Sequence, residues 1–190
     1  MDKQEVRAAA KRRRAVISAK EWRQCGAQMA VRLFSLPQWQ KARTVLAFCA
    51  MPDEPDTTLV LRRTLADGKR LCLPRVQAGQ NGAMAFVPVE NLSALALGAY
   101  GILEPTGPAL PAGTAFGADT LALVPCLAAD EGGVRLGRGG GYYDRFLARY
   151  QGQKLLLCPT ALLLPEHSLP AEAWDICFAP GEVLTEDNLL

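Results

Sequence analysis

Glycines and arginines are interleaved in residues 135–144, which read R-L-G-R-G-G-G-Y-Y-D. Glycine lets the backbone approach an anion closely and adopt positive φ angles, and each guanidinium group can neutralise phosphate charge. A simple connecting turn needs few glycines, whereas this segment contains four glycines, two arginines and an aspartate. The composition therefore predicts a loop that binds phosphate groups.

The segments on either side of this loop are those that would position it. Residues 121–129 form an apolar run that suits a buried strand, and residues 142–150 have the apolar spacing of a helix. The first turn of a helix offers unpaired N–H groups and the positive end of the helix dipole to an anion. Strand, glycine loop and helix in this order favour a phosphate site.

Two better-known phosphate loops do not fit. A dinucleotide fingerprint that starts at Gly137 requires a third glycine at position 142, which is Tyr142. A Walker A loop that starts at Gly132 requires Lys followed by Ser or Thr, where this chain has Arg138 and Gly139. The loop therefore belongs to a different class.

The segment resembles the signature of 5-formyltetrahydrofolate cyclo-ligases, commonly R-L-G-x-G-x-G-Y-Y-D. Further resemblances extend over nearly the whole chain. The family start K-x-x-L-R matches Lys3 and Arg7, with Val6 in place of Leu, and the serine that opens the next helix matches Ser18. Lys3 and Arg7 share one helix face, so both side chains can point at a polyphosphate.

Other family segments also have counterparts. M-x-x-E-x-x-T matches residues 51–57, and G-I-x-E-P matches residues 101–105, whose Glu104 has no assigned role. The closing pattern L-P-x-E-x-H-D matches residues 169–175, except that Trp174 replaces His or Asn. The family also carries a glutamine where this chain has Leu164.

The resemblance implies an ATP-dependent carbon–nitrogen ligase of folate and one-carbon metabolism that converts 5-formyltetrahydrofolate to 5,10-methenyltetrahydrofolate, with release of ADP and phosphate. It implies a set of ATP-binding residues: Lys3, Arg7, Arg135, Leu136, Gly137, Arg138, Gly139, Gly140, Gly141, Tyr142 and Tyr143. It implies folate-binding residues: Cys49, Glu54, Arg138, Gly139, Gly140, Gly141 and Tyr142. Catalytic roles fall to Arg138 and Tyr142, and Mg²⁺ ligation falls to Asp144 and Asp175.

The chain length and the order of apolar runs predict the fold. We expect one domain over residues 1–190, with a three-layer α/β/α Rossmann-like core, a mostly parallel sheet, and two N-terminal helices in residues 2–36 packed on that core. The expected strands are residues 44–51, 69–76, 84–89 at an edge, 121–129, 154–159 and 176–184, and the later helices are residues 57–66 and 142–150. We expect residues 77–83 to form a loop and the last six residues to form a tail.

Local signals refine the helices. Ser18 and Glu21 have the spacing of a capping box, and Asp56 is the expected N-cap of the helix over residues 57–66. The apolar face of the second helix is expected to use Trp22, Ala27, Ala30, Val31 and Phe34. We interpret residues 11–14, K-R-R-R, as a solvated helix face.

Cysteine and histidine usage narrows the chemistry. The six cysteines form no C-x-x-C pair and are expected to be free thiols in a reducing compartment. A single histidine, His167, gives little support to a Cys–His or Ser–His–Asp mechanism. The sequence contains no recognisable signal peptide and no apolar run of membrane-spanning length. We therefore expect a cytoplasmic location and no membrane partner.

Charge bears on the possible partners. The 21 basic and 19 acidic residues give a formal net charge of +2, which argues against nucleic acid as the main partner. One alternative is another phosphate-binding enzyme, such as a sugar-phosphate isomerase, which would not need Mg-ATP. A second is a nucleic-acid binder that uses the basic N-terminal helix, and it would show affinity that depends steeply on salt. We expect a monomer or a weak dimer.

Overall fold

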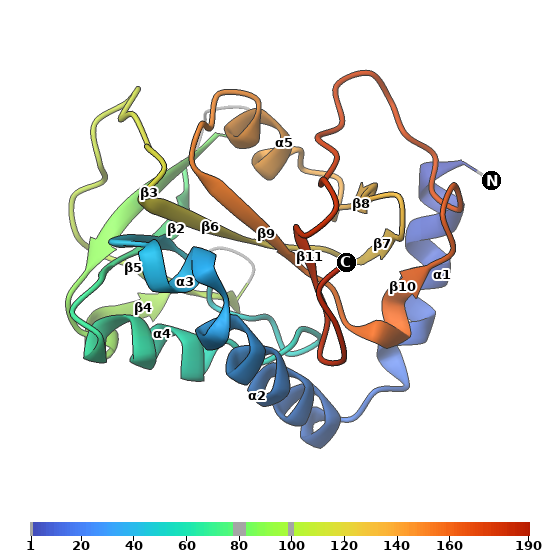
Figure 1. Ribbon diagram of the computed structural model, residues 1–190, viewed down its shortest axis with the longest axis horizontal. Coiled ribbons are helices and arrows are strands. Elements are labelled where there is room, and N and C mark those ends of the chain that lie inside the picture. Colours follow the sequence, from blue (N-terminus) through green and yellow to red (C-terminus); the bar gives the residue numbers. More distant parts are fainter. Residues whose placement is uncertain (1, 78–82, 99–100) are drawn as a thin grey trace.

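A computed structural model shows a central sheet with helices on both faces (Figure 1) and describes residues 2–77, 83–98 and 101–190. The sheet contains β1 (Thr44–Leu46), β2 (Arg70–Val76), β3 (Met84–Val89), β6 (Thr120–Pro125), β9 (Gln153–Leu157) and β11 (Val183–Leu184). Their order is β11–β9–β6–β1–β2–β3, and every neighbouring pair is parallel except β2 and β3. The predicted mostly parallel sheet and its edge strand are confirmed.

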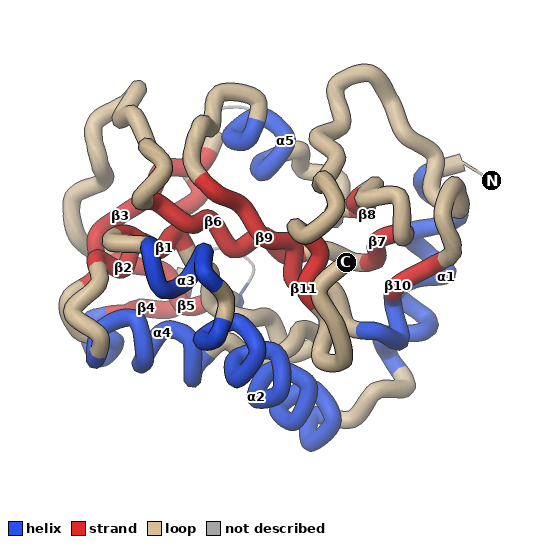
Figure 2. Tube along the Cα trace, viewed as in Figure 1, coloured by secondary structure: helices blue, strands red, loops and turns tan. Residues whose placement is uncertain are grey.

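Helices and two small sheets complete the fold. The helices are α1 (Lys3–Ala15), α2 (Ala19–Ser35), α3 (Pro37–Lys41), α4 (Thr58–Ala66) and α5 (Tyr142–Leu147), with short 3-10 turns at Leu92–Ala94 and Thr160–Leu162. A three-stranded sheet has the order β10 (Leu163–Leu164), β7 (Ala128–Asp130), β8 (Arg135–Leu136), and a hairpin joins β4 (Leu95–Leu97) to β5 (Leu103–Pro105). Helices α2, α3 and α4 lie on one side of the central sheet and α5 on the other (Figure 2).

Alternating side chains of the parallel strands produce the three layers. In β6, Leu121 and Leu123 pack into the core cluster that contains residues of α2, α3 and α4. Ala122 and Val124 point to the opposite face, where two further clusters receive residues of α1 and α5. Successive residues of a strand face opposite sides of a sheet, so an apolar run that lacks alternation forms a strand covered on both faces.

The two N-terminal helices begin as predicted but bury different faces from the expected ones. Ser18 and Glu21 form the predicted capping box at the start of α2. The buried residues of this helix are Trp22, Gly26, Met29, Ala30 and Leu33. Val31, predicted to be buried, is 71% exposed, because the buried stripe is rotated by about one residue around the helix.

The prediction that residues 11–14 form a solvated face is wrong for Arg14. Lys11, Arg12 and Arg13 are exposed, but Arg14 is only 1% exposed. Val6, Ala10 and Arg14 are spaced by four residues and lie on one face of α1, which packs against the core. The apolar stripe of this helix therefore ends in a buried cation.

Two predicted strands are shorter than expected. The strand predicted over residues 44–51 pairs as β1 only as far as Leu46. The strand predicted over residues 121–129 is divided into β6 and β7. Between them, the carbonyl oxygens of Cys126 and Leu127 accept hydrogen bonds from Arg14 at 3.2 and 3.1 Å. These carbonyls are therefore used by a side chain from α1.

Other boundaries are also corrected. The N-cap position of α4 is Thr57 and not Asp56, although the Asp56 carboxylate accepts a hydrogen bond from Thr58 N at 2.8 Å. Thr57 Oγ1 instead donates to Phe48 O at 2.7 Å and accepts from Ala50 N at 3.2 Å, so it attaches α4 to the segment after β1. Helix α5 ends at Leu147 instead of Tyr150.

The end of the chain differs most from expectation. The strand predicted over residues 176–184 is limited to β11, because Pro180 and Gly181 form a turn before it. The last six residues are not a tail. Val183 and Leu190 exchange two backbone hydrogen bonds of 2.9 and 2.8 Å, which return the chain against β11.

Two further predictions concern a loop and the absence of a membrane-spanning segment. The loop predicted over residues 77–83 includes residues 78–82, which lie outside the described residues. Within the described part of the chain, no helix has the length and apolar character needed to cross a membrane.

The contact between α2 and the turn before α4 gives a stability prediction. A Cβ on Gly26 would overlap the backbone of Asp56, whose N–H donates to Trp22 O at 3.2 Å. We expect Gly26→Ala to lower the free energy of unfolding by about 3 kcal/mol through overpacking. The matched control is Gly68→Ala, since a Cβ on Gly68 has no neighbour within 4 Å and only its positive φ of 69° is strained.

The expected loss for Gly68→Ala is about 1 kcal/mol. Urea denaturation monitored by circular dichroism measures both values. Equal losses for the two variants would contradict the close contact between α2 and this turn.

Candidate active site

The described residues line an open cavity of about 850 Å³ at the carboxyl ends of the central strands. Phe48 and Cys49 follow β1 and line it, as do Pro125 and Cys126 at the end of β6. From β1 the chain proceeds to β2 on one side, and β6 lies on the other side, so the strand order reverses between β1 and β6. Ligands of open α/β sheets bind at such a switch point, and the volume suits a small-molecule site.

The cavity brings together all the residues proposed for the site from the sequence. They come from α1, the segment after β1, the glycine loop with the start of α5, and the segment before β11. The residues that line the cavity include Lys3, Arg7, Cys49, Glu54, Arg135, Leu136, Gly137, Arg138, Gly139, Gly140, Gly141, Tyr142, Tyr143, Asp144 and Asp175. Their shared location is a finding, whereas their individual roles stay predictions.

The glycine loop departs in one respect from the expected phosphate site. Gly139 has φ +102°, a conformation that side-chain-bearing residues rarely adopt, so glycine is required there. Helix α5 has only six residues, which makes its dipole a smaller contribution than the nine-residue helix expected from the sequence. Positive side chains are therefore the main attraction for an anion.

Helix α1 supplies two of these positive side chains. Arg7 Nε donates to Gly137 O at 3.0 Å and so attaches the helix to the glycine loop. Lys3 Nζ lies 2.6 Å from Asp175 Oδ2 and 2.5 Å from Glu172 Oε2. Burial works to lower the pKa of Lys3, but the hydrogen bonds to these two carboxylates outweigh it and hold the pKa above its ordinary value.

Arg135 and Tyr143 leave two polar atoms without partners. Arg135 NH2 donates to Asp144 Oδ1 at 2.6 Å, and its side chain is only 4% exposed. Arg135 Nε and the Tyr143 hydroxyl are buried and have no hydrogen-bond partner within the described residues. Burial raises the pKa of Tyr143 well above its ordinary value, so the hydroxyl stays protonated. Two donors are thus available to a ligand with acceptor oxygens.

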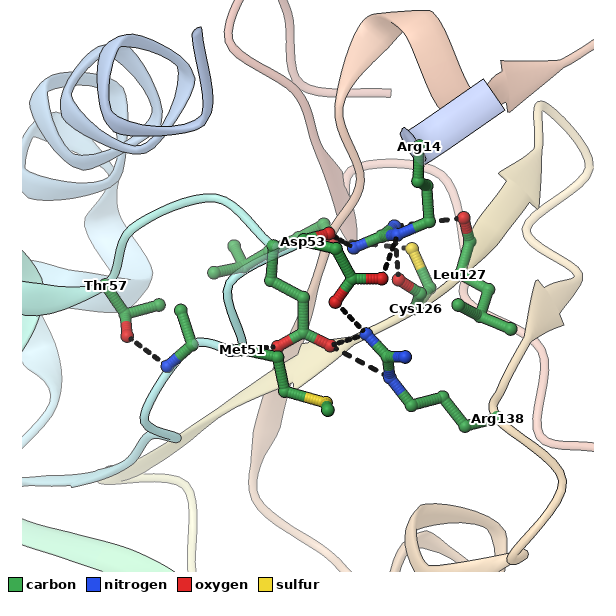
Figure 3. Close-up of polar contacts among 10 residues, drawn as sticks. Arg14, Met51, Asp53, Thr57, Cys126, Leu127 and Arg138 are labelled. Atoms are coloured by element: carbon green, nitrogen blue, oxygen red, sulfur yellow. Dashed lines mark hydrogen bonds and ion pairs between the residues drawn. The ribbon is translucent and has the colours of Figure 1, made fainter. Parts of the chain in front are cut away.

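Arg138 joins the glycine loop to the loop after β1 (Figure 3). Its NH2 group lies 2.6 Å from Asp53 Oδ1 and 2.9 Å from Glu54 Oε1, and its Nε donates to the same Glu54 oxygen at 3.2 Å. The ATP-binding loop and the folate-binding segment predicted from the sequence are therefore in direct contact. Arg138 belongs to both predicted sets, and it is the residue that makes this contact.

The proposed Mg²⁺ ligands, Asp144 and Asp175, both line the cavity. In this structure Asp144 forms an ion pair with Arg135, and Asp175 forms one with Lys3. Burial works to raise the pKa of Asp175, but Lys3 and the Glu172 backbone outweigh it and hold the pKa below its ordinary value. No group of three or more His, Cys, Asp or Glu side chains suited to a metal occurs in the described ranges. Two carboxylates nevertheless fit Mg²⁺, which commonly takes its remaining ligands from water and substrate phosphates.

Three residues of the family motifs differ in position: Trp174 and Leu164, where this chain departs from the pattern, and Glu104, where it matches. Trp174 is 69% exposed and lies on the cavity wall beside Asp175. Glu104, on β5, also lines the cavity. Leu164 is in β10, pairs with β7 and is not among the lining residues, so its side chain has no part in the wall of the cavity.

Sequence reasoning missed two charged residues of this region. Arg14 was assigned to a solvated face, and Asp53 was not singled out. The four-residue spacing of Val6, Ala10 and Arg14 was an available signal for burial. Asp53 had no comparable signal, because its partners come from segments far away in the sequence.

The partly buried position of Cys49 gives a pH prediction. Burial raises the pKa of this thiol to about 11, so that about one thiol in a thousand is ionised at pH 8. We expect its reaction with a disulfide reagent such as 5,5′-dithiobis(2-nitrobenzoate) to be slow at pH 8 and about tenfold faster per pH unit up to pH 10. The measurement compares Cys177→Ser with Cys177→Ser/Cys49→Ser, since Cys177 is exposed.

The difference in labelling rate between these two variants belongs to Cys49. A Cys49 labelling rate that is already high at pH 8 and does not change with pH would contradict the raised pKa.

Comparisons with known proteins agree with this geometry. The model of the 5-formyltetrahydrofolate cyclo-ligase family matches residues 1–185. The 5-formyltetrahydrofolate cyclo-ligase of Escherichia coli K12 is 32% identical over 168 residues, which cover 87% of this chain and 91% of that protein. The mouse 5-formyltetrahydrofolate cyclo-ligase is 28% identical over 193 residues, 98% of this chain and 94% of that protein.

Two solved structures are also similar. The 5,10-methenyltetrahydrofolate synthetase of Aquifex aeolicus is 33% identical, with a TM-score of 0.81 over 100% of this chain and 92% of that chain. The 5,10-methenyltetrahydrofolate synthetase of Mycoplasma pneumoniae, at 17% identity, shares the fold with a TM-score of 0.73 over 98% of this chain and 99% of that chain. The family model covers the glycine loop, the segment after β1 and the acidic residues before β11, so the cavity and the sequence lead to one conclusion: the chain belongs to the 5-formyltetrahydrofolate cyclo-ligase family.

Proposed function

We propose that the protein converts 5-formyltetrahydrofolate and ATP to 5,10-methenyltetrahydrofolate, ADP and phosphate in this cavity. The observation that carries the proposal is the placement of Arg138, which contacts the loop assigned to folate while it belongs to the loop assigned to ATP. Membership of the cyclo-ligase family supports the folate reaction. The cations along the cavity support a polyphosphate co-substrate.

The reaction has a chemical barrier that ATP removes. The formyl group on N5 is an amide, so its carbon is a poor electrophile. Transfer of the γ-phosphoryl group to the formyl oxygen breaks the terminal P–O bond of ATP and releases ADP. N10 of the same folate then bonds to the formyl carbon and loses its proton, and phosphate leaves with the formyl oxygen. Ring closure is intramolecular, so a bound folded folate avoids much of the entropic cost.

The side chains of the cavity are suited to charge neutralisation and positioning. Phosphoryl transfer depends mainly on these two effects and needs little covalent chemistry from the protein. Arg135 Nε and the Tyr143 hydroxyl, which have no partner within the described residues, would donate to phosphate oxygens. Arg138 would neutralise charge on the transferred group, and Tyr142, which also lines the cavity, would act with it.

The other binding roles follow from position. Lys3 and Arg7 would hold the distal phosphates from α1, and Glu54 and Cys49 would contact the folate. Bound Mg²⁺ would neutralise phosphate charge, with Asp144 and Asp175 as its protein ligands. Asp144 would then leave its ion pair with Arg135, and Asp175 its ion pair with Lys3, to bind the metal.

An assay of the purified protein tests the reaction. With 5-formyltetrahydrofolate and Mg-ATP, we expect the near-ultraviolet absorbance of methenyltetrahydrofolate to rise, and to stay flat without ATP. Arg138→Ala should lower kcat/KM by about 100-fold, as expected for the loss of one charge-stabilising donor. The matched control is Arg12→Ala, because Arg12 is an exposed arginine of α1 that does not line the cavity.

The outcomes separate the alternatives. Turnover that persists in Arg138→Ala would keep the reaction and reject the assigned role of this arginine. No ATP-dependent turnover by the folded wild-type protein would contradict the proposed function and leave a phosphate-binding isomerase as the remaining enzyme hypothesis.

The metal assignment has a separate test. We expect Asp144→Asn and Asp175→Asn to raise the Mg²⁺ concentration for half-maximal rate by about tenfold each, because each removes one of two protein ligands. Asp119→Asn is the control, since Asp119 is exposed and outside the cavity. Mg²⁺ titration at saturating ATP measures the shift, and an unchanged midpoint in both variants would remove these carboxylates from the metal site.

A further inference from the structure

We propose that Asp53 is a positioning residue that fixes the Arg138 guanidinium against the folate side of the cavity, with buried Arg14 as its anchor. Asp53 and Arg14 do not line the cavity, whereas Arg138 and Glu54 do. Asp53 therefore acts on a substrate only through Arg138. The inference rests on the proposed function for the role of Arg138, and one of its tests is independent of that function.

The Arg14 guanidinium group has a fixed orientation because it is buried and hydrogen-bonded. Its side chain is 1% exposed, and NH1 donates to the carbonyl oxygens of Cys126 and Leu127 at 3.2 and 3.1 Å. NH2 donates to the backbone oxygen of Asp53, and the guanidinium lies 4.9 Å from the centre of the Trp22 ring. A planar donor fork with this many partners has one orientation.

Asp53 transmits that orientation through a single carboxylate. Its Oδ2 accepts from Arg14 Nε at 3.2 Å, and its Oδ1 accepts from Arg138 NH2 at 2.6 Å (Figure 3). Burial works to raise the pKa of Asp53, but the two arginines outweigh it and hold the pKa below its ordinary value. The carboxylate is therefore ionised at neutral pH and binds both cations.

Arg138 needs this third contact because Glu54 alone does not define its direction. Both hydrogen bonds from Arg138 to Glu54 end on one oxygen, Oε1, while Oε2 accepts from Met51 N at 3.0 Å. A fork that shares one acceptor atom can pivot about it. The Asp53 oxygen prevents the pivot, and a misplacement of about 1 Å at a reacting centre can cost about 100-fold in rate.

A purely structural tether between α1 and the loop after β1 is the competing explanation, and a double-mutant cycle distinguishes the two. If Asp53 acts through Arg138, Asp53→Asn should lower kcat about tenfold in the wild-type background and have no further effect in Arg138→Ala. The Michaelis constants for ATP and folate should change less than about twofold, since positioning acts on the transition state. A structural tether predicts additive losses.

The variants have matched controls. Asp56→Asn removes a carboxylate from the same turn. This carboxylate accepts a hydrogen bond from Thr58 N, and we expect its loss to leave kcat unchanged. Asp53→Glu keeps the charge and lengthens the side chain, and it should lose less activity than Asp53→Asn. It also keeps the proposal testable if Asp53→Asn fails to fold. Urea unfolding of every variant separates activity from stability.

A second readout requires no activity. The Nε–H resonance of Arg138, assigned by its absence in Arg138→Lys, should exchange with solvent at least about tenfold faster in Asp53→Asn and at the wild-type rate in Asp56→Asn. Unchanged exchange in Asp53→Asn, or additive losses of kcat in the cycle, would overturn the proposal. Faster exchange in a protein without cyclo-ligase turnover would retain the positioning of Arg138 and reject the proposed function.

Discussion

The buried guanidinium of Arg14 is the interaction on which the site depends. A charge removed from water is costly unless hydrogen bonds and an opposite charge replace the solvent. Here the carbonyls of Cys126 and Leu127 and the Asp53 carboxylate replace it. These partners lie on two segments and Arg14 itself lies on a third, so one side chain holds α1, the end of β6 and the loop after β1 together. The same contacts coincide with the division of the predicted strand into β6 and β7.

Charge balance around the cavity follows the same principle. Each of three lining cations, Lys3, Arg135 and Arg138, is paired with at least one carboxylate, so the positive charge that suits a polyphosphate is compensated within the described structure. At these three side chains a phosphate ligand would take the place of a carboxylate. Such exchange costs less than the desolvation of unpaired ions. In the proposed reaction it would also leave carboxylate oxygens beside the phosphates, where a divalent cation would be favoured.

The parallel sheet explains why these charges converge. In the central sheet all strands except β3 run in the same direction, and the strand order reverses between β1 and β6. The segments that follow these two strands therefore extend in opposite directions, and the cavity lies between them. Residues separated by 84 positions, Glu54 and Arg138, come into contact there. The core leucines of both sheet faces supply a rigid support for loops that carry the chemistry.

Features that depend on near neighbours in the chain could be predicted from the sequence. The glycine loop, the capping box of Ser18 and Glu21 and the apolar strands could all be predicted, because glycine conformation, caps and alternation are local properties. Three other features depend on the tertiary structure: Arg14 is buried, Asp53 lies between two arginines, and the chain end returns against β11. The physical reason is that the environment of a polar group is set by partners remote in the chain, and the free energy of burying it depends on those partners and not on its own spacing.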